Sequence, residues 1–204
     1  MPNSRPDLSL DSSGICSACR SVEAKYKVDW KQREEEWNEL VDWAKEKAVS
    51  RGNDYDCIAA VSGGKDSTYI VYKCIESGLR PLGVSFEPTL MSKTGQENLE
   101  NLQETFGIDV IQVKKDRQTY KEVQRQALFT VGDSEYPNHQ GIFSTVNREA
   151  VYRNIPLALW GENPPGEYAP PNKEAAENKN LDRKWLEEFG GLLGLRLSDF
   201  DIDT

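Results

Sequence analysis

Several features are absent from this chain of 204 residues, and each absence narrows its class. No run approaches the roughly 20 apolar residues of a membrane-spanning helix. The first residues lack the apolar segment of a secretory signal, so we expect a cytoplasmic protein with no membrane partner. The four cysteines are widely scattered, which fits a reducing compartment better than a disulfide framework.

Positive charge is also scarce. The chain has 25 lysines and arginines against 34 aspartates and glutamates, which gives a net charge of −9. Nucleic-acid binding gains much of its affinity when basic residues neutralise phosphates, and this sequence has no sustained basic stripe. The balance disfavours a nucleic-acid partner and favours a small-molecule substrate.

Apolar runs and helical patterns alternate after an irregular segment at 1–28 and a helix at 29–49. The expected order is strand 57–61, helix 67–77, strand 81–86, helix 96–106, strand 108–113, helix 120–131, a polar loop at 132–140, helix 141–154 and strand 155–160. Such alternation predicts an α/β fold, an open parallel sheet with helices on both faces.

The most informative segment follows the strand at 57–61, where Ser62-Gly63-Gly64-Lys65-Asp66-Ser67 leads directly into a helical pattern. Adjacent glycines let the backbone approach an anion closely, and the N–H groups of a helix N-terminus point toward it. The spacing is not that of a Walker A loop. The order Ser-Gly-Gly-x-Asp-Ser resembles the PP-loop of the ATP pyrophosphatases, which implies that the loop holds the β,γ-pyrophosphate of ATP while AMP is transferred to an acceptor.

Ligands bind at the carboxyl ends of the strands in an open parallel sheet. Four segments should meet there: 62–67, 85–87, 114–116 and 161–163. The residues expected to bind ATP are Val61, Ser62, Gly63, Gly64, Lys65, Asp66, Ser67 and Phe86.

Asp66 is the expected Mg²⁺ ligand, because Mg²⁺ takes oxygen ligands from carboxylates and phosphates together. The alternative is an acidic residue that simply complements the dipole of the first helical turn. We expect catalytic roles for Asp66, Lys65 and Glu162.

Candidate substrate-binding residues lie outside the loop, at Asn98, His139, Glu162 and Asn163. His139 is the only histidine and is suited to acid–base chemistry, although an exposed loop histidine is the simpler explanation. Glu162 and Asn163 close the last strand, where turn residues are ordinary.

The cysteines give a weaker signal. Cys16 and Cys19 have the spacing of a zinc-ligand pair, yet structural zinc usually takes four ligands. Cys57 and Cys74 fall at positions expected to be buried, where a free thiol behaves as a small apolar side chain.

Several phrases together resemble one PP-loop family, the N-acetyl-sugar amidotransferases of lipopolysaccharide and nonulosonic-acid biosynthesis. The similar stretches are 14–19, 28–35, 55–69, 78–82, 94–99, 141–143 and 155–163. The resemblance implies an adenine nucleotide alpha hydrolase-like fold that uses ATP and Mg²⁺. It implies that the acetamido oxygen of a nucleotide-linked N-acetyl sugar is adenylated and that ammonia then displaces AMP, which leaves an acetamidino group. The implied ammonia source is a partner glutaminase that acts through a cyclase-like synthase subunit.

The chain also departs from that family. Family members resemble a longer protein, commonly with another Cys-x-x-Cys upstream, and often carry Cys where Asn138 stands here. Two other functions stay open: a PP-loop ligase that modifies tRNA or a nucleobase, and a non-catalytic ATP-binding subunit. The expected domains are an N-terminal Cys-x-x-Cys segment and helix (1–50), the ATP-binding domain (51–171) and a short helical, acidic tail (172–204). We expect the acidic residues 198–204 to be loose.

Overall fold

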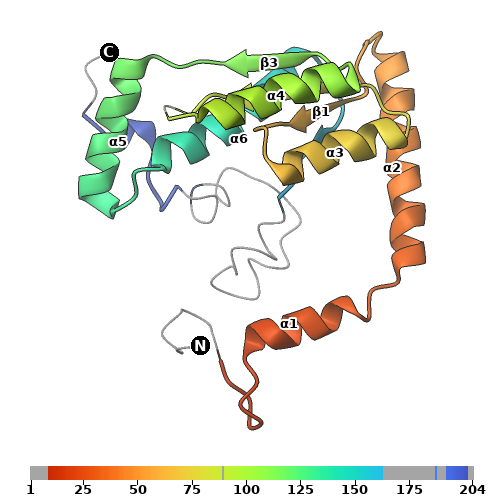
Figure 1. Cartoon of the computed structure of the whole chain (residues 1–204), viewed down its shortest axis with the longest axis horizontal. Helices are drawn as coiled ribbons and strands as arrows, with labels where there is room; N and C mark the ends of the chain where they lie inside the picture. The colour runs from red at the N-terminus through yellow and green to blue at the C-terminus, as the bar shows by residue number, and fades with distance from the viewer. Residues whose placement is uncertain (1–8, 89, 163–186, 188–191, 202–204) are drawn as a thin grey trace. The chain divides into compact units, whose positions relative to one another are not determined.

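A parallel sheet organises the chain in the computed structural model, which describes residues 9–88, 90–162, 187 and 192–201 (Figure 1). Within the described part the sheet has four strands in the order β3-β2-β1-β4. They are β1 (Cys57–Ala60), β2 (Pro81–Phe86), β3 (Val110–Val113) and β4 (Ala158–Leu159). All neighbouring pairs are parallel, which confirms the predicted open sheet, although β4 is much shorter than the predicted strand at 155–160.

The apolar run of β1 makes it the central strand. Ile58 lies opposite both Leu82 of β2 and Ala158 of β4, and residues 57–59 are fully buried. A strand that is covered on both faces cannot alternate polar with apolar side chains, which explains the continuous apolar sequence.

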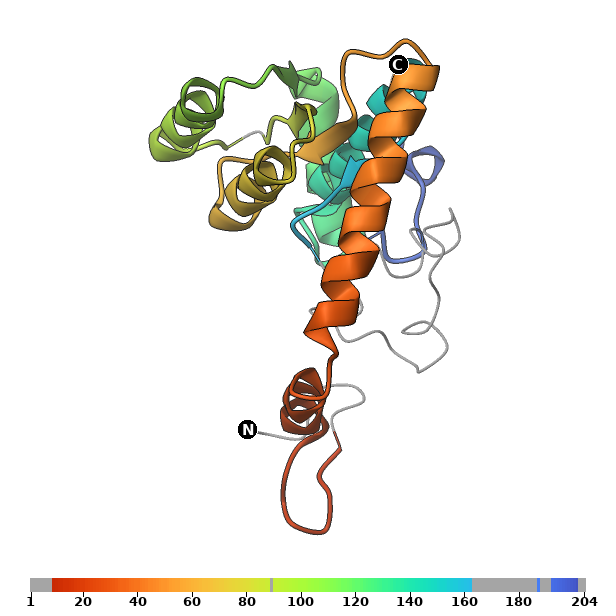
Figure 2. The same cartoon turned by 90° about the vertical axis from the view of Figure 1, so that its right-hand side faces the viewer.

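Helices cover both faces of the sheet, as predicted (Figures 1 and 2). On one face, Ala59 and Val61 pack with Val71 of α3 (Lys65–Glu76) and with Leu99 of α4 (Lys93–Phe106). On the other face, Ile58 and Val84 pack with Val146 of α6 (Tyr136–Tyr152), and α5 (Arg117–Val131) contacts α6. Helix α3, which follows β1, and helix α6, which precedes β4, therefore lie on opposite faces of the sheet. This places a topological switch point between β1 and β4, and open α/β sheets bind ligands at such a point.

Helix α6 corrects the sequence prediction at residues 132–140. The predicted loop is wrong from Tyr136 onward, because the helix begins there with Pro137 in its first turn. Proline suits that position, since its missing N–H has no partner within a helix anyway. His139 therefore lies on a helix, and its N–H donates to the carbonyl oxygen of Glu135 at 3.1 Å.

Two further corrections concern the ends of the chain. The predicted irregular segment 1–28 contains helix α1 (Ser17–Lys25). Near the C-terminus, where a loose tail was expected, Phe200 follows the short helix η1 (Leu197–Asp199) and is buried. Asn163 and most of the predicted C-terminal domain, 172–204, lie outside the described residues.

The described residues form two compact units that divide within helix α2 (Trp30–Ser50), between Leu40 and Val41. The first contains α1 and the first part of α2. The second contains the sheet, α3 to α6 and the packed part of α2 at Val41, Ala44 and Ala48. None of the described helices combines the length and apolar character that crossing a membrane requires.

Candidate functional site

The loop from Ser62 to Ser67 is held by its own polar groups. The N–H of Ser62 donates to Oγ of Ser67 at 3.2 Å, and that hydroxyl donates to the carbonyl oxygen of Gly64 at 3.0 Å. Gly63 has φ +76°, and a Cβ atom there would lie 2.7 Å from the carbonyl oxygen of Gly95 in α4. The first glycine of the loop is therefore required both by its backbone conformation and by the close approach of α4.

Helix α3 begins without a side-chain cap. Its N-cap residue is Gly64, whereas Ser92 caps α4 and Asp116 caps α5 with side-chain oxygens. The N-terminus of a helix carries backbone donors and the positive end of the helix dipole, both of which favour an anion. The start of α3 therefore has the features that favour binding of an anion.

A cavity of about 310 Å³ lies at the carboxyl ends of β1, β2 and β4. Gly161, after β4, approaches the loop so closely that a Cβ atom on it would lie 3.0 Å from the carbonyl carbon of Asp66. The structure therefore brings the carboxyl ends of β1 and β4, which flank the switch point, close together. The predicted site residues that line this cavity are Val61, Ser62, Gly64, Asp66, Ser67, Phe86, His139 and Glu162.

The other residues predicted for the ATP and substrate site do not line this cavity. Gly63, Lys65 and Asn98 line a separate, open groove between α3 and α4, and Nζ of Lys65 lies 2.7 Å from Oδ1 of Asp66. Asn163 lies outside the described residues. Asn98 is nonetheless close to the loop, since its Cβ atom lies 3.4 Å from the position that a Cβ on Gly63 would take.

The segment 114–116 supports the cavity from outside rather than lining it. Lys114 pairs with Glu87 at 3.0 Å, and the side chain of Asp116 accepts from the N–H of Thr119 at 2.7 Å. The segment therefore meets the residues that end β2, as expected, although its own side chains do not line the cavity.

Lys115 follows β3, and its side chain contacts residues of β2, α5 and the start of α6. Its Nζ lies 3.9 Å from the ring centre of Phe86 and 3.3 Å from that of Tyr120, and it donates to Oδ1 of Asn138 at 3.2 Å. Burial lowers the pKa of Lys115 to about 8, against the opposing effect of Glu135 and Glu87. The lysine thereby fixes both an aromatic and an amide side chain of the cavity wall.

Sequence reasoning missed the acidic residues at the start of α6. Glu135 lines the cavity, and Asp133 lies 3.9 Å from His139, measured from Oδ2 to Nδ1. A signal was present, because Pro137 marks the first turn of a helix and acidic residues commonly precede or open one.

The side chains that face the cavity fit a magnesium ion shared with phosphates. Asp66 and Glu162 both line the cavity and carry carboxylates, the ligands that Mg²⁺ prefers, and both oxygens of Asp66 accept from Nζ of Lys65. Bound there, Mg²⁺ would neutralise phosphate charge. The roles of both residues as ligands stay predictions.

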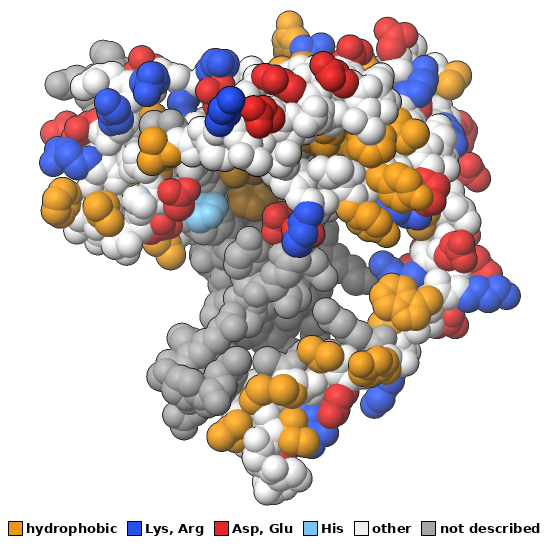
Figure 3. Space-filling model, viewed as in Figure 1, with side chains coloured by type: hydrophobic (Ala, Val, Ile, Leu, Met, Phe, Trp, Pro, Cys, Tyr) orange, Lys and Arg blue, Asp and Glu red, His pale blue; other side chains and the backbone are white. Residues whose placement is uncertain are grey.

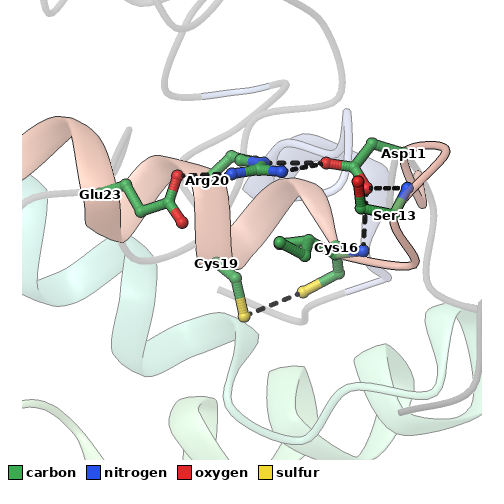
Figure 4. Close-up of polar contacts among 7 residues, drawn as sticks. Asp11, Ser13, Cys16, Cys19, Arg20 and Glu23 are labelled. Carbon is green, nitrogen blue, oxygen red and sulfur yellow. Dashed lines mark hydrogen bonds and ion pairs between the residues drawn. The ribbon is translucent and has the colours of Figure 1, made fainter.

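The residues around Cys16 and Cys19 do not by themselves form a complete zinc site (Figure 4). Their sulfur atoms lie 3.4 Å apart, and the hydrogen bond between the two thiols, together with repulsion between their charged forms, raises the pKa of the Cys19 thiol. Asp11 and Arg20 form an ion pair beside them. Within the described residues no group of three or more His, Cys, Asp or Glu side chains is placed to hold a metal, so zinc stays a prediction.

The other two cysteines are buried as predicted. Cys57 of β1 and Cys74 of α3 are fully buried, with their sulfur atoms 3.9 Å apart. Both are free thiols that fill the core.

Comparison with known proteins gives a limited result. No family model and no curated protein matches the chain. Among solved structures, it is similar to an NMN synthetase from Francisella tularensis, with a TM-score of 0.48, 16% identity and coverage of 83% of this chain and 74% of that one. It is similar to an NH3-dependent NAD synthetase from Campylobacter jejuni, with a TM-score of 0.49, 12% identity and coverage of 86% and 80%.

A third similar structure is a predicted subunit of tRNA methyltransferase from Methanocaldococcus jannaschii. Its TM-score is 0.37, with 14% identity and coverage of 69% of this chain and 65% of that one. These are likenesses of overall arrangement.

Proposed function

We propose that this chain is an ATP-dependent amidotransferase of the ATP-pyrophosphatase type. It adenylates the acetamido oxygen of a nucleotide-linked N-acetyl sugar and joins ammonia to the activated carbon, releasing pyrophosphate and AMP. The observation that carries the proposal is the single cavity that joins the uncapped N-terminus of α3 to Glu162 after β4.

The phosphate half of the proposal follows from the loop. The first turn of α3, which includes Asp66 and Ser67 at the cavity, carries backbone N–H groups that have no acceptor within the helix, and the side chain of Lys65 lies beside it. Such donors stabilise negative charge that is already in place and charge that develops on a departing pyrophosphate. Asp66 and Glu162 would hold Mg²⁺ against the same phosphates.

The acceptor half rests on the resemblance of the sequence phrases to the N-acetyl-sugar amidotransferases. An amide carbon is a poor electrophile, and adenylation turns its oxygen into a good leaving group. The cavity must therefore align the amide oxygen with the α-phosphorus, and positioning supplies much of the rate. The wall formed by Glu135, Asn138 and His139 gives polar groups that suit a sugar acceptor.

Ammonia is proposed to come from a partner glutaminase through a cyclase-like synthase subunit. In the assay, ammonium salt replaces both partners, so the chain is tested alone.

The experiment combines the chain with ATP, Mg²⁺, ammonium and a panel of nucleotide-linked N-acetyl sugars. We expect sugar-dependent release of AMP and pyrophosphate, with a product in which mass spectrometry finds one oxygen replaced by NH. Asp66→Ala should abolish both signals. Asp54→Ala is the matched control, because it removes an equally exposed carboxylate from the turn before β1.

Two outcomes would contradict the proposal. Release of AMP that depends on tRNA and not on a sugar would make the chain a tRNA-modifying ligase. Tight binding of ATP without AMP formation under any acceptor would make it a nucleotide-binding subunit.

A further inference from the structure

The single histidine of the chain lines the same cavity as the phosphate loop. His139 lies in the first turn of α6, and its side chain is 43% exposed. Its Nδ1 atom is buried and has no hydrogen-bond partner within the described residues, so the exposed part of the ring includes the side that bears Nε2. Figure 3 shows the imidazole at the surface beside acidic side chains.

The carboxylate that faces this buried nitrogen is Asp133. Its Oδ2 lies 3.9 Å from Nδ1 of His139, and its Oδ1 accepts from the N–H of Glu135 at 2.7 Å. The second contact fixes the carboxylate within the turn that leads into α6. A separation of 3.9 Å is longer than a hydrogen bond, but such contacts commonly tighten when substrate binds.

The other charged groups near His139 are engaged with one another. Glu135 accepts a hydrogen bond from the amide of Asn138, and Lys115 donates to the same amide. Lys115 is also held between two aromatic rings. Asp66 and Glu162 line the same cavity, but among the described residues Asp133 is the carboxylate that lies 3.9 Å from an imidazole nitrogen.

When this contact tightens, the carboxylate accepts a hydrogen bond from Nδ1, and the proton of a neutral imidazole then lies on that atom. Nε2 then keeps its lone pair and can accept a proton. This is the arrangement that a general base needs on the exposed side of the ring.

We infer that His139, positioned by Asp133, is the base that deprotonates the attacking ammonia in the amidine-forming step; this rests on the function proposed above. The lone pair of ammonia forms a bond to the imidate carbon, and one ammonia proton passes to Nε2 of His139. The bond from that carbon to the AMP oxygen breaks, and its electron pair leaves with AMP. The imidazolium then returns its proton to water.

The two half-reactions separate this inference from the proposed function. Adenylation is followed as sugar-dependent exchange of pyrophosphate into ATP without ammonia, and amidination as acetamidino-sugar formed with ammonium. Asp66→Ala should abolish both. In His139→Gln the ratio of amidination to adenylation should fall by about 100-fold or more, the usual range of general-base catalysis.

Asp133→Asn tests the positioning role. Asparagine keeps the oxygen that accepts from Glu135, so the turn is preserved while the charge that faces His139 is lost. We expect the same ratio to fall, by less than in His139→Gln. Asp54→Asn makes the same charge change at an exposed site before β1 and should leave the ratio unaltered.

A spectroscopic readout does not depend on turnover. Because the chain has one histidine, its imidazole signals in NMR are assigned without ambiguity. We expect the Nδ1–H tautomer in the native chain and a shift toward Nε2–H in Asp133→Asn. Added imidazole should also restore part of the amidination lost in His139→Ala, which a purely structural role would not allow.

Three results would overturn the inference. Equal losses of both half-reactions in His139→Gln would assign the residue to substrate binding alone. Unchanged tautomers in Asp133→Asn would remove the positioning role. If the native chain showed no sugar-dependent exchange of pyrophosphate into ATP, the proposed function and the base role would both be overturned. The NMR measurement would still decide whether Asp133 and His139 are paired.

Discussion

Asp56 shows at the scale of one residue how the strands are joined at the edge of the sheet opposite the loop from Ser62 to Ser67. It immediately precedes β1 and is almost fully buried, and it accepts hydrogen bonds from the backbone and the guanidinium of Arg80 before β2. Burial would raise the pKa of Asp56, but the bonds from Arg80 outweigh it and hold the pKa below the ordinary value of 3.8. The ion pair therefore ties the starts of two neighbouring strands.

Replacement of Asp56 by asparagine should reveal this contribution. A group whose pKa is lowered in the folded state stabilises it above the unfolded pKa, and the stabilisation is lost as pH falls through the folded pKa. We expect Asp56→Asn to lower the free energy of unfolding at neutral pH by about 1.5–3 kcal/mol. Urea titrations should show that the difference from the native chain narrows below pH 3.8. Asp54→Asn, exposed in the same turn, should show no such difference at either pH.

Residues whose role is set by their immediate sequence were predictable. The turn from Ser62 to Ser67 between a strand and a helix was predicted correctly, because its glycines, hydroxyls and following helical pattern are local features. Asp133 and Lys115 were not, because their roles depend on side chains of other elements, at His139, Phe86 and Tyr120. No pattern along the chain encodes such a contact.

At the scale of the elements, the start of α4 packs closely against the loop from Ser62 to Ser67. The carbonyl oxygen of Gly95 lies where a Cβ on Gly63 would meet it, and the N–H of Gly95 donates to Oγ of Ser92 at 3.0 Å. The cap of α4 therefore fixes the backbone against which the phosphate loop rests.

We expect Ser92→Ala to destabilise the protein by about 1 kcal/mol, because the N–H of Gly95 loses its partner. Ser92→Asn is the matched control, since asparagine caps helices as well as serine does and should restore the stability. Urea-induced unfolding measures both. Equal stability of the alanine variant and the native chain would show that Ser92 does not cap α4.

The helix boundaries also show the limits of sequence patterns. Apolar spacing located α3, α4, α5 and α6 but placed each start late, by two to five residues. First turns are polar and solvent-facing, so their periodicity is weak and capping chemistry is the better guide. At α6 the late start hid His139 in a predicted loop and obscured its relation to the cavity.

At the scale of the whole molecule, residues near the C-terminus pack against α5 and against α6, the helix that contains His139. Phe200 lies against Tyr136 at the start of α6, with ring centres 5.0 Å apart, and joins a cluster with Val123, Ala127 and Leu192. Gln126 of α5 exchanges two hydrogen bonds with the backbone of Asp201, at 2.6 and 2.9 Å. The acidic composition of 198–204 predicted a loose tail, because one buried aromatic side chain does not alter an average over a segment.

Phe200→Ala tests whether this packing stabilises the sheet domain. Truncation of a buried phenylalanine leaves a cavity, so we expect a loss of about 3 kcal/mol, whereas Phe200→Leu fills most of the space and should cost less than about 1.5 kcal/mol. Urea unfolding measures both variants. Hydrogen exchange then locates the effect, which should be faster exchange in α5 and α6, where Tyr136 loses its contact, and little change in α3. Native-like stability in Phe200→Ala would show that α6 keeps its position without the C-terminal residues, and the orientation of His139 would then depend on Lys115 and the turn at Asp133 alone.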